Sequence, residues 1–189
     1  RTVRAGLVSA FSAAASNPEV RAVLLRAAGP SWPSGGELSE LDAEPLEPPL
    51  DRVCDIVEAS PLPVVALLHG AVLGGGLELA AAAGARVALP GTSFGMPEVT
   101  LGLCAGAGGT RRLPALVGPK QALGLMLTGL PVGTDAAVAM GLIDGVLDED
   151  ALSVAGALAL SLAAGGGGGG RGRGARVAAG LADPAGYVE

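Results

Sequence analysis

The stretch PVVALLHGAVLGGGLELAAAA, residues 63–83, decides the fold of this 189-residue chain. Its first part, residues 63–69, is apolar almost without interruption, which is typical of a strand that is covered on both faces. A glycine triplet follows, and residues 77–83 then predict a helix so rich in Ala that neighbouring elements can approach it closely. A buried strand followed by a buried helix indicates an α/β fold.

The regions on either side of this stretch continue the alternation of helices and strands. Apolar residues at helical or strand spacing, bounded by Gly, Pro and Asn, mark the expected elements. Helices are expected at residues 3–15, 50–59, 111–117, 119–127, 134–140 and 151–164, and strands at residues 20–25, 86–89 and the end of 141–147. Loops are expected at residues 29–36, 93–98 and 102–109, a solvated connection at residues 38–49, and a tether from the glycine run at residues 165–170 onward.

Composition limits the class of protein. The chain carries 12 Lys and Arg against 18 Asp and Glu, for a formal net charge of −6, and its aromatic residues are one Trp, one Tyr and two Phe. A nucleic-acid-binding protein would need a basic surface or aromatic stacking platforms, so that class is excluded. One His and two cysteines, Cys54 and Cys104, cannot furnish a structural zinc or iron–sulfur site, and we expect both thiols to be free and buried. The length fits one domain.

Two glycine-rich loops, residues 34–36 and residues 74–76, each follow a strand that is expected to be buried. Glycine lets a ligand approach the backbone closely, and the second loop opens a helix whose first N–H groups have no partner inside the helix. Such donors suit an anion, or an oxygen that becomes anionic during a reaction. Glycine at these positions also serves close packing of a helix on a strand, so both interpretations stay open at this point.

Glu78 is the most informative single residue. It stands in the first turn of a helix whose other residues are apolar, where burial of a carboxylate is costly. A Glu at this position of an exposed helix often only complements the helix dipole, but the surrounding sequence predicts burial and favours a functional carboxylate. Glu98, in the sequence MPEV at residues 96–99, is typical of a solvated loop when it is considered alone.

Longer motifs resemble those of the enoyl-CoA hydratase/isomerase (crotonase) family. The similarity is carried by residues 63–66 and 69–80, by FGMPEVTLG at 94–102 and GAGGTRRL at 106–113, and it continues through residues 127–129 and 139–143. It covers roughly residues 3–147. The segments GLELA, residues 76–80, and PEVTLGL, residues 97–103, are most similar to hydratase domains of multifunctional fatty-acid oxidation enzymes.

This resemblance implies a thioester held in an oxyanion hole. The two N–H donors would belong to Ser34 and Gly75, while Glu78 and Glu98 would act on a water molecule as general base and acid. The backbone at Gly106 would help to hold the water or the product hydroxyl. The implied substrate contacts are Ser34, Gly35, Gly36, Glu37, Leu38, Gly74, Gly75, Pro97 and Gly106. The resemblance implies no metal and no redox cofactor. Coenzyme A would enter only as part of the substrate.

The resemblance also implies a fold, a crotonase (ClpP-like) spiral of ββα units with a truncated N-terminal strand and a truncated C-terminal helical region. Residues 1–147 would form the crotonase core, and residues 148–189 a partial C-terminal helix and a glycine-rich tail. The chain has SGGE at residues 34–37 where the family has AGAD, and Ala105 where it usually has Pro. We expect these changes to alter loop stiffness more than chemistry.

The presence of both glutamates favours hydration over double-bond isomerisation, which needs one acidic group. We therefore expect an enoyl-CoA hydratase of fatty-acid β-oxidation, with a Δ3,Δ2-enoyl-CoA isomerase and a non-catalytic crotonase-like scaffold subunit as alternatives. The implied partner is an acyl-CoA thioester, bound by a homotrimer or by a domain of a larger multifunctional protein, in the cytoplasm, the mitochondrial matrix or the peroxisome. His69, Glu78 and Arg86 interrupt the longest apolar stretch, residues 64–89, so no membrane span is expected.

Overall fold

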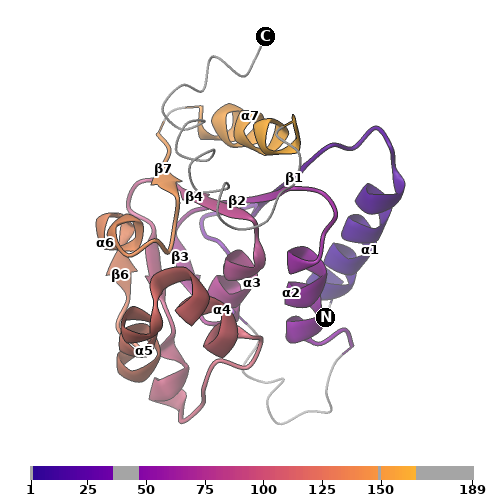
Figure 1. The fold of residues 1–189 in the computed structure, drawn as a ribbon. Helices are drawn as coiled ribbons and strands as arrows, with labels where there is room; N and C mark the ends of the chain where they lie inside the picture. The colour runs from indigo at the N-terminus through magenta and orange to yellow at the C-terminus, as the bar shows by residue number, and fades with distance from the viewer. Residues whose placement is uncertain (1, 36–46, 149, 165–189) are drawn as a thin grey trace.

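A computed structural model describes residues 2–35, 47–148 and 150–164 of the chain (Figure 1). Its helices are α1 (Thr2–Ser16), α2 (Leu50–Glu58), α3 (Gly75–Ala82), the 3-10 helix η2 (Pro97–Leu101), α4 (Gly109–Val117), α5 (Pro119–Thr128), α6 (Thr134–Ala139) and α7 (Ala151–Ala164). Its strands are β1 (Val23–Arg26), β2 (Val64–Leu68), β3 (Ala71–Leu73), β4 (Ala85–Ala88), β5 (Ser93–Gly95), β6 (Val132–Gly133) and β7 (Gly145–Val146). Among the described helices, none combines the length and the apolar character that crossing a membrane requires.

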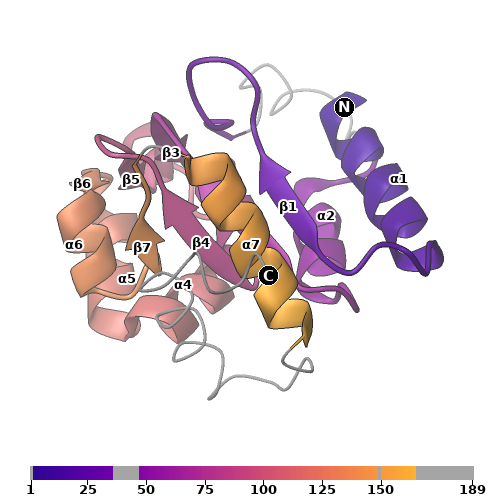
Figure 2. The same cartoon turned by 90° about the horizontal axis from the view of Figure 1, so that it is seen from above.

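Four parallel strands form the main sheet, in the order β1–β2–β4–β7. The central strand β2 has all five residues buried. Its side chains alternate, so that Val64, Ala66 and Leu68 join the core built with α2, α3 and α4, whereas Val65 and Leu67 pack against α7. Figures 1 and 2 show α7 lying across one face of this sheet, with the other helices on the opposite side. This cover on both faces confirms the strand predicted at residues 63–69.

Three short strands form a second sheet, in the order β3–β5–β6, in which β3 and β5 are parallel and β6 is antiparallel to β5. β3 follows β2 after only His69 and Gly70, and α3 begins directly after it. β4 and β5 then repeat the succession of a main-sheet strand and a second-sheet strand before η2 and α4. This order is the expected strand–strand–helix unit of the spiral.

Helix positions were predicted more accurately than those of the short strands. The helices expected at residues 3–15, 50–59, 119–127, 134–140 and 151–164 are confirmed to within two residues at each end. α3 and α4 begin two residues earlier than expected, each on a glycine, and β1 begins at Val23 rather than at residue 20. The loop predicted at residues 93–98 is wrong, because β5 and η2 occupy most of it. Residues 38–46 and 165–170 lie outside the described residues.

The loop after β1 packs directly on the first turn of α3. Trp32, only 2% exposed, donates a hydrogen bond from Nε1 to the carbonyl oxygen of Gly76 at 2.9 Å. Its backbone N–H donates to the carbonyl oxygen of His69 at 2.8 Å. A Cβ built at Gly76 would lie 1.7 Å from the carbonyl oxygen of Pro33. Only glycine therefore fits at this point, although the backbone there is ordinary helix.

Replacing Gly76 tests this close approach. Gly76→Ala is expected to lower the free energy of unfolding by roughly 3 kcal/mol, because the new methyl group must push the Pro33 carbonyl away. Gly124→Ala is the matched control, since Gly124 lies within α5 and a Cβ built there meets nothing within 4 Å. The control should raise the free energy of unfolding by about 0.5–1 kcal/mol. Urea denaturation measures both, and equal midpoints for the two variants would contradict the close approach.

Candidate active site

Glu78 lies in the first turn of α3 and is only 2% exposed. Its Oε1 atom accepts hydrogen bonds from the backbone N–H groups of Ala107 and Gly109, each 2.7 Å long. Two main-chain donors on one carboxylate oxygen offset part of the cost of removing the negative charge from water. The predicted burial of Glu78 is confirmed, and its hydrogen-bond partners come from a loop thirty residues further along the chain.

The Ala107 donor lies in the loop that leads into α4, and the Gly109 donor is the first residue of that helix. Gly108 has a φ of 93°, in the left-handed region, and precedes the first residue of α4. N–H groups on either side of such a residue can converge on one anion. A Cβ built at Gly109 would lie 2.8 Å from Oε1 of Glu78, so a side chain there would displace the carboxylate. The glycines of this loop thus allow the backbone to reach Glu78.

Glu98 lies in η2, immediately after the Pro97 that begins this helix. Its side chain is half-buried, and its Oε2 atom is buried without a hydrogen-bond partner among the described residues. Its Oε1 atom would lie 3.0 Å from a Cβ built at Gly74. Burial raises the pKa of the Glu98 carboxyl, and the negative charge of Glu78 adds to the increase, against a smaller opposing effect of its own backbone. Glu98 is therefore suited to carry a proton.

The two glycine-rich loops lie side by side, as the sequence predicts. A Cβ built at Gly35 would lie 3.2 Å from the backbone nitrogen of Gly75, and one built at Gly74 would lie 3.6 Å from the carbonyl oxygen of Ser34. Neither the Ser34 N–H nor the Gly75 N–H donates to another described residue. Both groups are thus available to a ligand, and their binding of one oxygen stays a prediction.

The remaining predicted contact residues are only partly described. Gly36, Glu37 and Leu38 lie outside the described residues. Pro97 is half-buried beside Glu98, and Gly106 is exposed in the loop before α4, next to the Ala107 donor. The contacts of Pro97 and Gly106 with substrate stay predictions.

The cysteines differ from the expectation in one respect. Both are free, but Cys104 is exposed, so the prediction that both thiols are buried is wrong for it. Cys104 stands in the segment between η2 and α4, next to residues 101–103, which are exposed as well. Cys54 is fully buried in α2, and this burial raises the pKa of its thiol to about 12. A thiol with that pKa is inert at neutral pH.

Sequence reasoning missed several residues that shape the site. Trp32 anchors the first glycine-rich loop, and the Ser31 hydroxyl fixes the same loop by accepting from the Ala71 N–H at 2.8 Å. A tryptophan among turn residues could have indicated burial, because large aromatic side chains rarely stay in water. The third is Arg112, which is buried beside the loop before α4. The sequence pair Arg111–Arg112 carries no signal that tells which of the two is buried.

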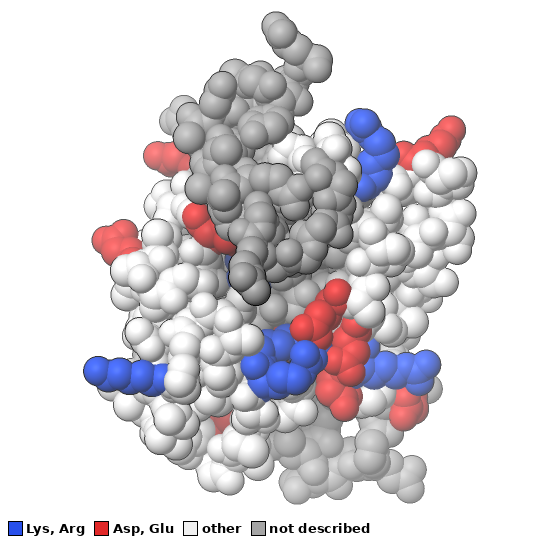
Figure 3. All heavy atoms as spheres, in the orientation of Figure 1, with Lys and Arg blue, Asp and Glu red and all other residues white. Residues whose placement is uncertain are grey.

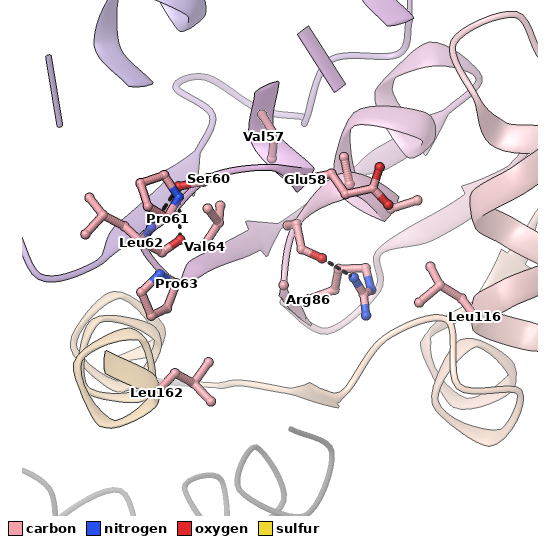
Figure 4. Close-up of a pocket in the computed structure, with 14 residues that line it drawn as sticks. Val57, Glu58, Ser60, Pro61, Leu62, Pro63, Val64, Arg86, Leu116 and Leu162 are labelled. Carbon is pink, nitrogen blue, oxygen red and sulfur yellow. Dashed lines mark hydrogen bonds between the residues drawn. The ribbon is translucent and has the colours of Figure 1, made fainter. Parts of the chain in front are cut away.

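A cavity of about 270 Å³ lies at the amino ends of β2 and β4 (Figure 4). Its lining includes Pro63, Val64, Arg86 and the C-terminal end of α3, but neither Glu78 nor Glu98. The Arg86 guanidinium donates to the carbonyl oxygens of Ala83 and Leu142, which gives it a structural role. We therefore do not assign this cavity to the candidate active site.

The fold and the site together define a class of α/β protein with two carboxylates in unlike surroundings beside two glycine-rich loops. The sequence profile of the enoyl-CoA hydratase/isomerase family matches residues 1–163. The chain therefore belongs to the enoyl-CoA hydratase/isomerase family.

Individual relatives agree with this assignment. The chain is 38% identical to the peroxisomal bifunctional enzyme of Danio rerio over 81% of its own length and 21% of that protein. It is 48% identical to the fatty acid oxidation complex subunit alpha of Shewanella amazonensis over 69% of its own length and 20% of that protein. The chain thus spans about a fifth of the length of these curated relatives.

Solved structures confirm the crotonase fold. The enoyl-CoA hydratase from Thermoplasma volcanium superposes with a TM-score of 0.72 at 27% identity. The match covers 95% of this chain and 79% of the solved chain.

The pKa of Glu98 yields a stability prediction. A carboxyl whose pKa is raised in the folded state contributes stability that is full below the unfolded pKa and is lost as the pH rises through the folded pKa. The free energy of unfolding of the wild type should therefore fall, relative to Glu98→Gln, as the pH rises from about 4 to 7. Urea denaturation across that range measures the difference. Glu19→Gln, at an exposed position, is the control, and the same pH slope in both variants would refute the prediction.

Proposed function

We propose that this chain is an enoyl-CoA hydratase of fatty-acid β-oxidation, which adds water across the 2,3 double bond of a 2-trans-enoyl-CoA thioester. The observation that carries the proposal is the pair Glu78 and Glu98, two neighbouring carboxyl groups in unlike surroundings. Glu78 is deeply buried and accepts two main-chain hydrogen bonds, whereas Glu98 has a raised pKa and one buried oxygen without a partner. Such a difference suits one carboxyl group to accept a proton and the other to donate one.

In the proposed reaction Glu78 acts as the base and Glu98 as the acid. Glu78 takes a proton from water while the water oxygen bonds to C3 of the substrate, and Glu98 gives its proton to C2. Glu78 ends protonated and Glu98 ends ionised, so a proton must return from Glu78 to Glu98, directly or through solvent, before the next turnover. Because the negative charge of Glu78 raises the pKa of Glu98, protonation of Glu78 makes Glu98 a stronger acid.

The thioester oxygen becomes negatively charged when the water oxygen bonds to C3. The N–H groups of Ser34 and Gly75 would stabilise this charge, since neither donates to another described residue, and a Cβ built at Gly35 would lie only 3.2 Å from the Gly75 nitrogen. The Gly75 N–H also belongs to the first turn of α3, where the helix dipole favours negative charge. Backbone donors need no reorientation during the reaction, because the packing of Trp32 already fixes the loop.

Family membership supports the general part of this proposal, an enzyme of the enoyl-CoA hydratase/isomerase family. The peroxisomal bifunctional enzyme of Danio rerio and the fatty acid oxidation complex subunit alpha of Shewanella amazonensis are much longer than this chain. We therefore include in the proposal that the acyl-CoA site operates within a larger multifunctional protein or a homotrimer, and that coenzyme A enters only as part of the substrate. The mass of the protein in solution tests the oligomeric state.

Hydration of crotonyl-CoA is the direct test. The wild type should catalyse it, and Glu78→Gln and Glu98→Gln should each lower kcat by about 100-fold or more, because each removes one proton-transfer group. Loss of ultraviolet absorbance of the conjugated thioester measures the rate. Glu19→Gln, which changes an exposed carboxylate, should retain wild-type activity. A folded wild type without hydration of crotonyl-CoA or longer enoyl-CoA substrates would sink the proposal and favour a non-catalytic scaffold.

Isomerisation is a second candidate activity, favoured by the unpaired Oε2 of Glu98. In its ionised form the Glu98 carboxylate can remove a proton from C2 of a 3-enoyl-CoA and, once protonated, return it to C4, which moves the double bond from C3–C4 to C2–C3. Glu98→Gln should then abolish isomerisation while Glu78→Gln retains it. The test follows the appearance of the conjugated 2-enoyl product. Equal losses in both variants would argue against a proton shuttle by Glu98 alone.

A further inference from the structure

Arg112 is a buried charged residue that has no part in the proposed chemistry. It lies in α4, and its side chain is only 3% exposed, whereas the neighbouring Arg111 side chain is 61% exposed. A buried guanidinium must have hydrogen-bond partners, because removing its charge from water without them would cost several kcal/mol. Its partners therefore indicate what it holds in place.

The Arg112 guanidinium contacts two parts of the molecule. On one side, Nε and Nη2 donate to Oε2 of Glu58 at 3.2 and 2.9 Å, and Nη2 also donates to Asp55, both from α2. On the other side, Nη1 donates to the carbonyl oxygen of Ala107 at 2.8 Å. A Cβ built at Gly108 would lie 2.2 Å from Nη1, so the guanidinium fills the space that a side chain would need.

The residues that Arg112 holds are those that hold Glu78. The carbonyl of Ala107 accepts from Arg112, while the N–H of the same residue donates to Glu78. The second donor to Glu78, Gly109, lies just after the glycine against which Nη1 packs. A path of hydrogen bonds thus runs from the α2 carboxylates through Arg112 and the loop to the buried carboxylate.

We propose that Arg112 is a positioning residue for Glu78, which fixes the loop at residues 106–109 so that two N–H groups stay aimed at one carboxylate oxygen. The catalytic consequence rests on the proposed role of Glu78 as a base, but the positional claim does not. Without the guanidinium, the Ala107 carbonyl would lose its anchor, and the loop could move away from Glu78.

The chain supplies a matched control in Arg111. This arginine binds the same carboxylates, donating to Glu58 Oε2 at 2.6 Å and to Asp55 Oδ1 at 3.4 Å, but no bond links its side chain to the loop in the part of the chain that the structure describes. Figure 3 shows basic and acidic atoms side by side on an otherwise largely uncharged face, over α4 and α2, the helices that carry these residues. Arg111→Gln removes a cation from this cluster while leaving the loop anchor in place.

The test compares Arg112→Gln, Arg112→Lys and Arg111→Gln with the wild type. Arg112→Gln should lower kcat for hydration by about 10- to 100-fold, with KM changed less than about threefold, because misplacing Glu78 affects the reaction more than thioester binding. Arg112→Lys should fall between the wild type and Arg112→Gln, since one ammonium can replace only part of the guanidinium contacts. Arg111→Gln should stay within about twofold of the wild type.

A second measurement does not depend on turnover. Amide hydrogen exchange by NMR should be faster at Ala107 and Gly109 in Arg112→Gln than in the wild type or in Arg111→Gln, and intermediate in Arg112→Lys. Wild-type exchange in a folded Arg112→Gln would overturn the proposal, as would equal effects of the two glutamine variants. If Arg112→Gln does not fold, wild-type exchange in Arg112→Lys overturns it. Absence of hydration in the wild type would remove the proposed function, and the exchange rates would still decide the positional claim.

Discussion

The close approach between the loop after β1 and the first turn of α3 is the constraint on which the candidate site depends. At Gly76 there is no space for even a methyl group, because the Pro33 carbonyl occupies it. Trp32 fixes the same contact through its hydrogen bond to the Gly76 carbonyl. Since Ser34 directly follows Pro33 and Gly75 directly precedes Gly76, their N–H groups can face one ligand only while this approach persists. Main-chain packing therefore determines the chemistry available here.

The second feature of the site is that two identical carboxyl groups, those of Glu78 and Glu98, lie in different surroundings. Glu78 lies in an apolar helix, and main-chain dipoles compensate its burial. Glu98 is less buried, yet one of its oxygens has no partner among the described residues. An unpaired buried polar atom costs about 1–3 kcal/mol, so this arrangement does not serve stability. It would serve the proposed role of Glu98 in proton transfer, because a bound ligand could supply the missing hydrogen-bond partner.

Much of this arrangement could be predicted from the sequence, for identifiable reasons. The helices have apolar periodicities that persist over several turns, β2 is an uninterrupted apolar run, and the glycine loops and both glutamates stand in distinctive motifs. The short strands β3, β5 and β6 span only two or three residues, too few for any period to emerge. The donors to Glu78 are backbone N–H groups, which every residue except Pro carries, so residue type could not identify them. Arg111 and Arg112 share one side-chain chemistry and differ only through tertiary packing.

Main-chain packing is also the reason why the departures from the family motif at Ser34, Gly36, Glu37 and Ala105 need not alter the proposed reaction. The groups assigned to the oxyanion and to Glu78 are main-chain N–H groups, and a change of side chain leaves them in place as long as the backbone path is kept. That path is enforced elsewhere, by Gly76 against Pro33 and by Gly108 against Arg112. Because a Cβ at either glycine would overlap its neighbour, these positions should tolerate less change than the loop residues that face the ligand. The chemistry of the site is thus constrained most strongly by residues that do not take part in it.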